Sequence, residues 1–136
     1  MKILKYLVIV FLLTASFVSA QQFNFKSTAL SILQKNRNGE WGKWSNPKPT
    51  TVFAKLDYDN DKIIIYSTEI QHYKIIEYLP KEVSNVDEIN SYLCKNIDGI
   101  AVKISFIVRT DSGYKTQLYV YNEDFVFCYD IVEVTK

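Results

Sequence analysis

The sequence predicts an all-β fold, an antiparallel up-and-down meander of about seven or eight strands that forms a small barrel or a strongly twisted sheet. Three observations support this. Residues 100–109 alternate between apolar and other side chains, short turn-forming segments separate the later apolar runs, and Tyr and Phe recur throughout. A period of two gives a strand one buried face, and short connections join antiparallel neighbours.

The first half of the domain is expected to contain four strands, and a short helix at the end of the first is the alternative. Asn36 to Gly39 supplies a turn, because Asn-Gly tolerates positive φ. The Asn-Pro-Lys-Pro segment that follows is a loop, since proline cannot join a central ladder. Pro80 ends the fourth strand. The expected strands are 23–33, 50–57, 62–69 and 71–79.

A short helix is expected near residues 84–93. Val86, Ile89 and Leu93 have helical spacing, and Ser84 is a suitable N-cap. The alternative is that the second half of this segment, from 92 to 95, is already strand. Three more strands are then expected at 100–109, 114–121 and 125–134, separated by turns at 98–99, 111–113 and 122–124.

Residues 1–20 are expected to be a cleaved signal peptide. Lys2 and Lys5 form a positive n-region, residues 6–13 are uninterruptedly apolar, and Val18-Ser19-Ala20 offers a small-residue cleavage site. An uncleaved anchor or a buried N-terminal element are the alternatives. Cleavage would leave residues 21–136 as one β domain, exported to the periplasm or the medium, with no integral membrane segment.

The charge pattern argues against a nucleic-acid or anionic-membrane partner. Removing Lys2 and Lys5 leaves 14 basic and 15 acidic residues, which alternate along the chain without runs. Both kinds of partner require clustered positive charge. An unknown protein or a small ligand is the expected partner.

The two cysteines, Cys94 and Cys128, leave two interpretations open. In an exported protein an even cysteine count is compatible with a disulfide. Two separate buried thiols, acting as small apolar side chains, are the alternative.

Three acidic residues, Asp57, Asp59 and Asp61, suggest a Ca²⁺ loop. An EF-hand requires Gly at position six and Glu at position twelve, but Lys62 and Thr68 stand there. A different metal loop stays open, although Asp is also a common turn former. The turn is the favoured interpretation.

No catalytic set and no cofactor motif is recognised. His72 is the single histidine, and its alternating context predicts a solvated strand residue rather than a base. Trp41 and Trp44 are candidates for lining a ligand site, because Trp offers a large contact area and one N–H donor. Packing in the core or at its rim is the alternative.

Two family resemblances are carried by short motifs. Gly39-Glu40-Trp41 and Gly42-Lys43-Trp44 each resemble the G-x-W of lipocalins, which implies a barrel with an apolar ligand. Over residues 40–134, the order W-x-x-W, V-F-A-K-L-D, I-I-I-Y-S, Q-x-Y-x-I, C-x-x-x-D-G and Q-L-Y-V-Y is similar to uncharacterised small secreted β proteins of Bacteroidota. The second resemblance implies an exported β domain without an assigned activity.

Function is therefore expected to be binding or structural interaction without catalysis. One alternative is a lipocalin-like barrel that carries a small apolar ligand, which requires a cavity of roughly 300 Å³ or more. Another is an inhibitor or immunity-type partner protein, which requires exposed aromatic anchors. A hydrolase would require polar groups with perturbed pKa values that converge in a cleft.

Overall fold

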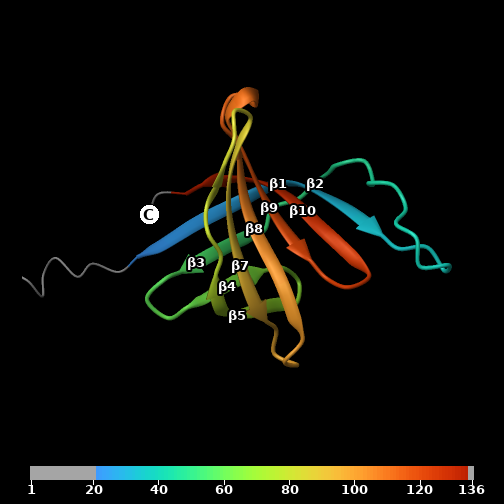
Figure 1. The fold of residues 1–136 in the computed structure, drawn as a ribbon, viewed down its shortest axis with the longest axis horizontal. Helices are drawn as coiled ribbons and strands as arrows, with labels where there is room; N and C mark the ends of the chain where they lie inside the picture. The colour runs from blue at the N-terminus through green and yellow to red at the C-terminus, as the bar shows by residue number, and fades with distance from the viewer. Residues whose placement is uncertain (1–20, 135–136) are drawn as a thin grey trace, which may run out of the picture.

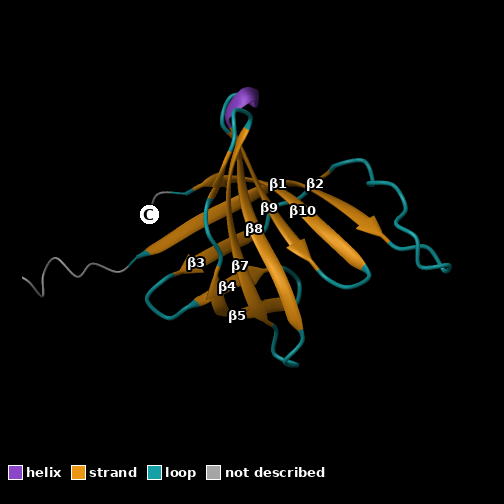
Figure 2. Cartoon of the chain, viewed as in Figure 1, coloured by secondary structure: helices purple, strands orange, loops and turns teal. Residues whose placement is uncertain are grey.

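The computed structural model describes residues 21–134, and the expected signal peptide at 1–20 lies outside the described residues. Strands make up most of this part of the chain (Figure 2). The elements are β1 (Gln22–Gln34), β2 (Lys48–Pro49), β3 (Phe53–Asp57), β4 (Lys62–Tyr66), β5 (Ile70–Tyr78), β6 (Glu82–Val83), β7 (Asp87–Lys95), β8 (Ala101–Arg109), the 3₁₀ turn η1 (Thr110–Ser112), β9 (Lys115–Tyr121) and β10 (Phe125–Glu133).

Eight antiparallel strands form a closed barrel, as the sequence predicts (Figure 1). The strands β1, β3, β4, β5, β7, β8, β9 and β10 follow one another around the wall, and β10 pairs with β1 to close it. Closure removes the unpaired edges of an open sheet, where backbone N–H and C=O groups lack partners. The two-residue strands β2 and β6 extend the wall beside β1 and β7.

Strand β1 pairs with β10 along one edge, with a register irregularity at Thr28, and has two neighbours along its other edge. Its first half pairs with β3, and its second half pairs with β2. Farther along, the Gly42 N–H donates to the carbonyl oxygen of Gln34 at 2.8 Å. A Cβ atom at position 42 would lie 3.0 Å from that oxygen, so glycine allows this close approach.

The helix expected near 84–93 is wrong in position. The expected single helical element exists among the described residues, but it is η1 at the β8–β9 turn (Figure 2). Residues 87–95 form strand β7, which agrees with the alternative given for its second half. Because β7 pairs with β5 and β6 on one side and with β8 on the other, a helix there would leave both edges open.

The local capping signal at Ser84 is used by a turn. The Ser84 hydroxyl accepts the N–H groups of Val86 and Asp87 at 3.2 Å each. Serine makes such bonds in turns as well as at helix N-termini. The helical spacing of the following apolar residues is therefore overridden by pairing with β8.

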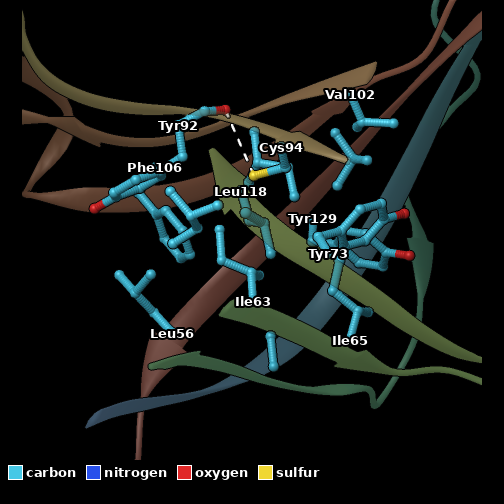
Figure 3. Close-up of a cluster of buried hydrophobic side chains, with 14 of the residues drawn as sticks. Leu56, Ile63, Ile65, Tyr73, Tyr92, Cys94, Val102, Phe106, Leu118 and Tyr129 are labelled. Carbon is cyan, nitrogen blue, oxygen red and sulfur yellow. Dashed lines mark hydrogen bonds between the residues drawn. The ribbon is translucent and has the colours of Figure 1, made fainter. Parts of the chain in front are cut away.

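Alternate residues from the strands fill the barrel interior. In Figure 3 the side chains of Ile63, Ile65, Cys94 and Leu118 converge from β4, β7 and β9. Each of the four is at most 1% exposed. Close packing of this kind leaves the middle of the barrel without room for a ligand.

The two cysteines are separate buried thiols, which corrects the disulfide interpretation. Cys94 belongs to the interior cluster. On β10, Phe127 and Tyr129 pack inside, so alternation places Cys128 between them on the outer face. The two side chains therefore point to opposite faces of the strand wall, whereas a disulfide requires Cβ vectors that point toward each other.

We expect unreduced protein to show no thiol that reacts with Ellman's reagent at pH 8 while folded, and two after unfolding. Burial raises the pKa of Cys94 to about 12 and also raises that of Cys128, and the thiolate is the reactive form. Fewer than two reactive thiols after unfolding would instead indicate the disulfide.

We expect Ile63→Ala to lower the free energy of unfolding by about 2–5 kcal/mol, because it opens a cavity in the packed interior. Ile97→Ala is the matched control. Ile97 is 79% exposed, so its truncation should change stability by no more than about 0.5 kcal/mol. Urea unfolding of both variants measures the difference, and equal losses would show that the interior is not packed as described.

Candidate functional site

A cup of about 270 Å³ opens at one mouth of the barrel. This mouth carries the start of β1, the β3–β4 turn and the ends of β8 and β10. Its lining comes from six strands and one turn, so rigid elements position it. The lining residues are Phe23, Phe25, Leu56, Tyr58, Asn90, Tyr92, Phe106, Val108, Thr116 and Glu133.

The cup exists because the inward side chains become smaller toward this mouth. Inside the barrel, β8 and β9 place Phe106 opposite Leu118, and both are buried. The next inward pair is Val108 opposite Thr116, which fills less volume. The floor of the cup is therefore packed, and the space above it stays open.

Aromatic rings form one side of the cup in a chain of edge-to-face contacts. Tyr92 lies edge-on to Phe106 with ring centroids 5.9 Å apart, and Tyr58 lies edge-on to Phe23 at 5.8 Å. Phe25 also packs against Phe106 at 5.2 Å. Such contacts fix the orientation of the rings, so the wall of the cup is preformed.

Hydrogen bonds hold the tyrosines at the mouth. The hydroxyls of Tyr58 and Tyr92 lie 2.5 Å apart, and the Tyr78 hydroxyl donates to Asp61. Burial raises the pKa of Tyr92, and its bond to Tyr58 adds to the rise. Burial and the bond to Asp61 raise the pKa of Tyr78. Both phenols therefore stay neutral and act as positioning groups.

Few polar atoms reach the cup. Besides the paired Tyr58 and Tyr92 hydroxyls, the polar side chains in its lining are Asn90, Thr116 and Glu133. An apolar cavity with a small number of polar groups is typical of small-molecule sites. The carboxylate of Glu133 disfavours an anionic ligand, so the cup suits a neutral or cationic one.

A larger hollow of about 550 Å³ lies beside the loop between β1 and β3. Ile32 and Gln34 contribute from β1, and Gly42, Lys43 and Ser45 from the loop. Its other lining residues come from β1, from the short strand β2 and from the segments that flank β2. Sites on loops are held less rigidly than sites on strands, and we therefore regard the cup as the better candidate.

Trp41 and Trp44 do not line the cup. Both lie in the loop between β1 and β3, and each contacts a different partner. The Lys35 ammonium lies 5.1 Å from the Trp41 ring centre. Trp44 packs edge-on against Tyr119 on the outer face, with centroids 6.1 Å apart. Both indoles are exposed at the rim, and their ligand role stays a prediction.

The three aspartates of the β3–β4 turn bind separate protein donors. Asp57 accepts the side-chain and backbone N–H groups of Asn60 at 2.9 and 3.2 Å. Asp59 accepts the backbone N–H of Gln21 at 3.0 Å, whereas Asp61 accepts the Tyr78 hydroxyl. Within residues 21–134, no group of three His, Cys, Asp or Glu residues could hold a metal ion. The carboxylates stabilise the turn.

His72 lies far from the cup along the barrel wall. It is exposed on β5 and borders a small hollow with Glu69, Asn96 and Ile97 at the opposite mouth. This agrees with the expected solvated strand position.

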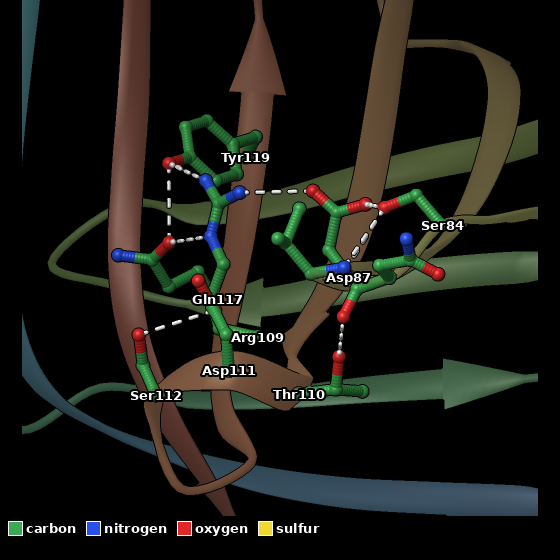
Figure 4. Close-up of polar contacts among 10 residues, drawn as sticks. Ser84, Asp87, Arg109, Thr110, Asp111, Ser112, Gln117 and Tyr119 are labelled. Carbon is green, nitrogen blue, oxygen red and sulfur yellow. Dashed lines mark hydrogen bonds and ion pairs between the residues drawn. The ribbon is translucent and has the colours of Figure 1, made fainter.

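A second polar cluster lies on the outer face of β7, β8 and β9 (Figure 4). Arg109 donates to Asp87 at 3.1 Å, to Gln117 at 3.2 Å and to Tyr119 at 3.2 Å. Ser84 also donates to Asp87, at 2.9 Å. The guanidinium donates to three protein acceptors on neighbouring strands. We therefore interpret this cluster as a structural link between the strands on the outside of the barrel.

No motif in the sequence points to the cup. Phe23, Asn90, Thr116 and Glu133 are separated by long stretches of chain, and none belongs to a motif. They come together only because the ends of their strands meet at the same mouth of the barrel. If the strand register had been known, some of them could have been identified as inward-facing residues close to turns.

We expect Asp57→Asn to lower the free energy of unfolding at pH 7 by about 1–2 kcal/mol. The bond from the Asn60 side chain lowers the pKa of Asp57. A lowered folded-state pKa gives stability that is present above the unfolded pKa of about 3.9 and is lost as pH falls through the folded value. The variant should therefore lose less stability than the parent in acid.

Urea unfolding at pH 7 and at pH 3 measures this difference. Asp98→Asn, at an exposed turn position, is the control and should behave as the parent does. The same acid sensitivity in Asp57→Asn as in the parent would contradict the assignment.

Comparison of the chain with protein-family models, with curated proteins and with solved structures finds no match. Across the described residues, no helix has the length and hydropathy needed to cross a membrane. Function is therefore inferred from the geometry of the chain's own residues.

Proposed function

We propose that this protein is an exported, non-catalytic binding domain whose cup takes one small, largely apolar ligand. The observation that carries the proposal is the preformed aromatic cup of about 270 Å³ above a packed barrel interior. Binding sites are usually concave and apolar, with a few oriented polar groups. The volume is slightly below the range typical for drug-sized ligands, so the ligand is small.

The lining selects for a flat, neutral or cationic compound. The rings of Phe25, Tyr58 and Phe106 offer faces and edges for an aromatic or alicyclic group. Asn90 and Thr116 supply hydrogen-bonding groups, while the carboxylate of Glu133 favours an amine or hydroxyl at the entrance. An acyl chain ending in a carboxylate fits less well.

The barrel geometry favours a ligand that is held at the mouth over one that is fully enclosed inside the barrel. The interior below the cup is filled by side chains, so a ligand would be held at the mouth and stay partly in contact with water. The closed meander is compatible with this role, but the filled interior does not offer the cavity of roughly 300 Å³ or more that a lipocalin-like barrel requires. Export would place the domain in the periplasm or the medium.

We expect the mature protein to bind the neutral fluorophore phenylnaphthylamine in the cup, with a rise in its emission. Thr116→Trp should weaken binding by about tenfold or more, because the indole fills space that the ligand needs. Fluorescence titration measures both affinities.

Tyr114→Trp is the matched control, since residue 114 is 72% exposed and does not line the cup. It should bind the fluorophore as the parent does. Urea unfolding of both variants checks that each is folded. The proposal fails if the parent binds none of several neutral or cationic aromatic probes, or if Thr116→Trp binds as tightly as Tyr114→Trp.

A further inference from the structure

An exposed apolar row crosses the outer surface of β3, β4 and β5. Phe53 lies directly opposite Tyr66, and Tyr66 lies directly opposite Ile70. Their exposed fractions are 50%, 43% and 53%. Ile97, which is 79% exposed, borders the same hollow as Ile70. These four residues form one apolar patch, and the exposed carboxylate of Glu69 borders it at the same hollow.

A row of three lysines runs across β4, β5 and β7 on the same outer surface. Lys62 lies opposite Lys74, and Lys74 lies opposite Lys95. Like charges placed directly opposite each other destabilise a sheet. Lys62 shares its row with Asp57, whereas in residues 21–134 neither Lys74 nor Lys95 has a carboxylate within ion-pair distance. This row therefore lacks a matching anionic partner within the chain.

The two rows are parallel and close. Lys62 and Tyr66 are the first and last residues of β4, four residues apart. Ile70 and Lys74 are likewise four residues apart on β5. Four residues of strand span about 13 Å. Between the rows, the half-exposed Lys55 adds one further positive charge. The apolar row and the lysine row thus lie about 13 Å apart along the strands.

We propose that this face docks on the surface of an anionic lipid bilayer. The apolar patch of Phe53, Tyr66, Ile70 and Ile97 would enter the boundary between headgroups and acyl chains. The row of Lys62, Lys74 and Lys95 would remain at the level of the lipid phosphates, where each lysine gains attraction from the negative surface. An anionic surface also relieves the repulsion between the paired lysines.

The combination of the two rows favours a bilayer over a nucleic acid. A phosphate backbone would use the lysines, but it offers little to Ile70 and Ile97, which have no aromatic face for a base to stack on. A second copy of the chain is disfavoured, because a symmetric contact would bring the two lysine rows together. The site lies on the outer face and shares no residue with the lining of the cup, so it adds a membrane-surface role that does not depend on the cup's ligand.

Sedimentation with lipid vesicles tests the proposal. We expect the mature protein to bind phosphatidylglycerol–phosphatidylcholine vesicles, and to bind pure phosphatidylcholine about tenfold more weakly or less. Lys74→Glu/Lys95→Glu should weaken binding to the anionic vesicles by about tenfold or more. Phe53→Ser/Ile70→Ser should also weaken it by about tenfold, although the net charge is unchanged.

Matched control variants keep the same chemistry at other places. Lys43→Glu/Lys48→Glu reverses two exposed lysines between β1 and β3, one in the loop and one on β2. Val83→Ser/Val86→Ser removes two exposed apolar side chains near β6, at the other end of the barrel. Both controls should bind anionic vesicles within about twofold of the parent. Urea unfolding of all four variants confirms that each is folded.

Three results would overturn the proposal. The first is a parent protein that does not sediment with anionic vesicles at low salt. The second is an equal loss in the Lys43→Glu/Lys48→Glu control, which would reduce the effect to net charge. The third is binding that Phe53→Ser/Ile70→Ser leaves intact and that duplex DNA competes away, which would assign the lysine row to a nucleic acid.

Discussion

Pairing between β1 and β10 is the constraint on which the rest of the structure depends. It joins the two ends of the domain, from Phe25 opposite Glu133 to Gln34 opposite Phe125. Without it the sheet would expose two long edges, and the interior would lack two of its walls. Once the ring is closed, the register of every strand is fixed relative to all others, because a slip of one residue would turn its side chains to the wrong face.

The inward or outward direction of each side chain follows from that register. Cys94 points into the packed interior and Cys128 points out, so a sequence with two cysteines forms no bridge. The same alternation sends Lys62, Lys74 and Lys95 outward on three neighbouring strands. Charges that are isolated in the sequence thereby become a continuous row. The sequence has no run of basic residues, but the folded surface brings three lysines into one row.

The barrel divides into a filled middle and an open mouth, and this division shapes the functional proposal. Ile104 and Leu118 occupy the centre with almost no exposure. At the mouth the inward pair becomes Val108 and Thr116, and the remaining space is walled by aromatic rings. A site that occupies only the mouth can take a small ligand without opening the core. The outer apolar and basic rows lie elsewhere on the wall, so ligand and surface contacts do not compete for the same residues.

The sequence by itself determined most of the strands, the turns and the all-β class. These depend on neighbouring residues, such as the alternation in 100–109 and the Asp98-Gly99 turn, where Gly99 has a φ of 79°. It also determined that the chain has few catalytic candidates. Only the tertiary structure decided that 87–95 is a strand, because pairing on both sides outweighs helical spacing. The cup, the separation of the thiols and the lysine row were likewise decided there, since each depends on register between strands far apart in the chain.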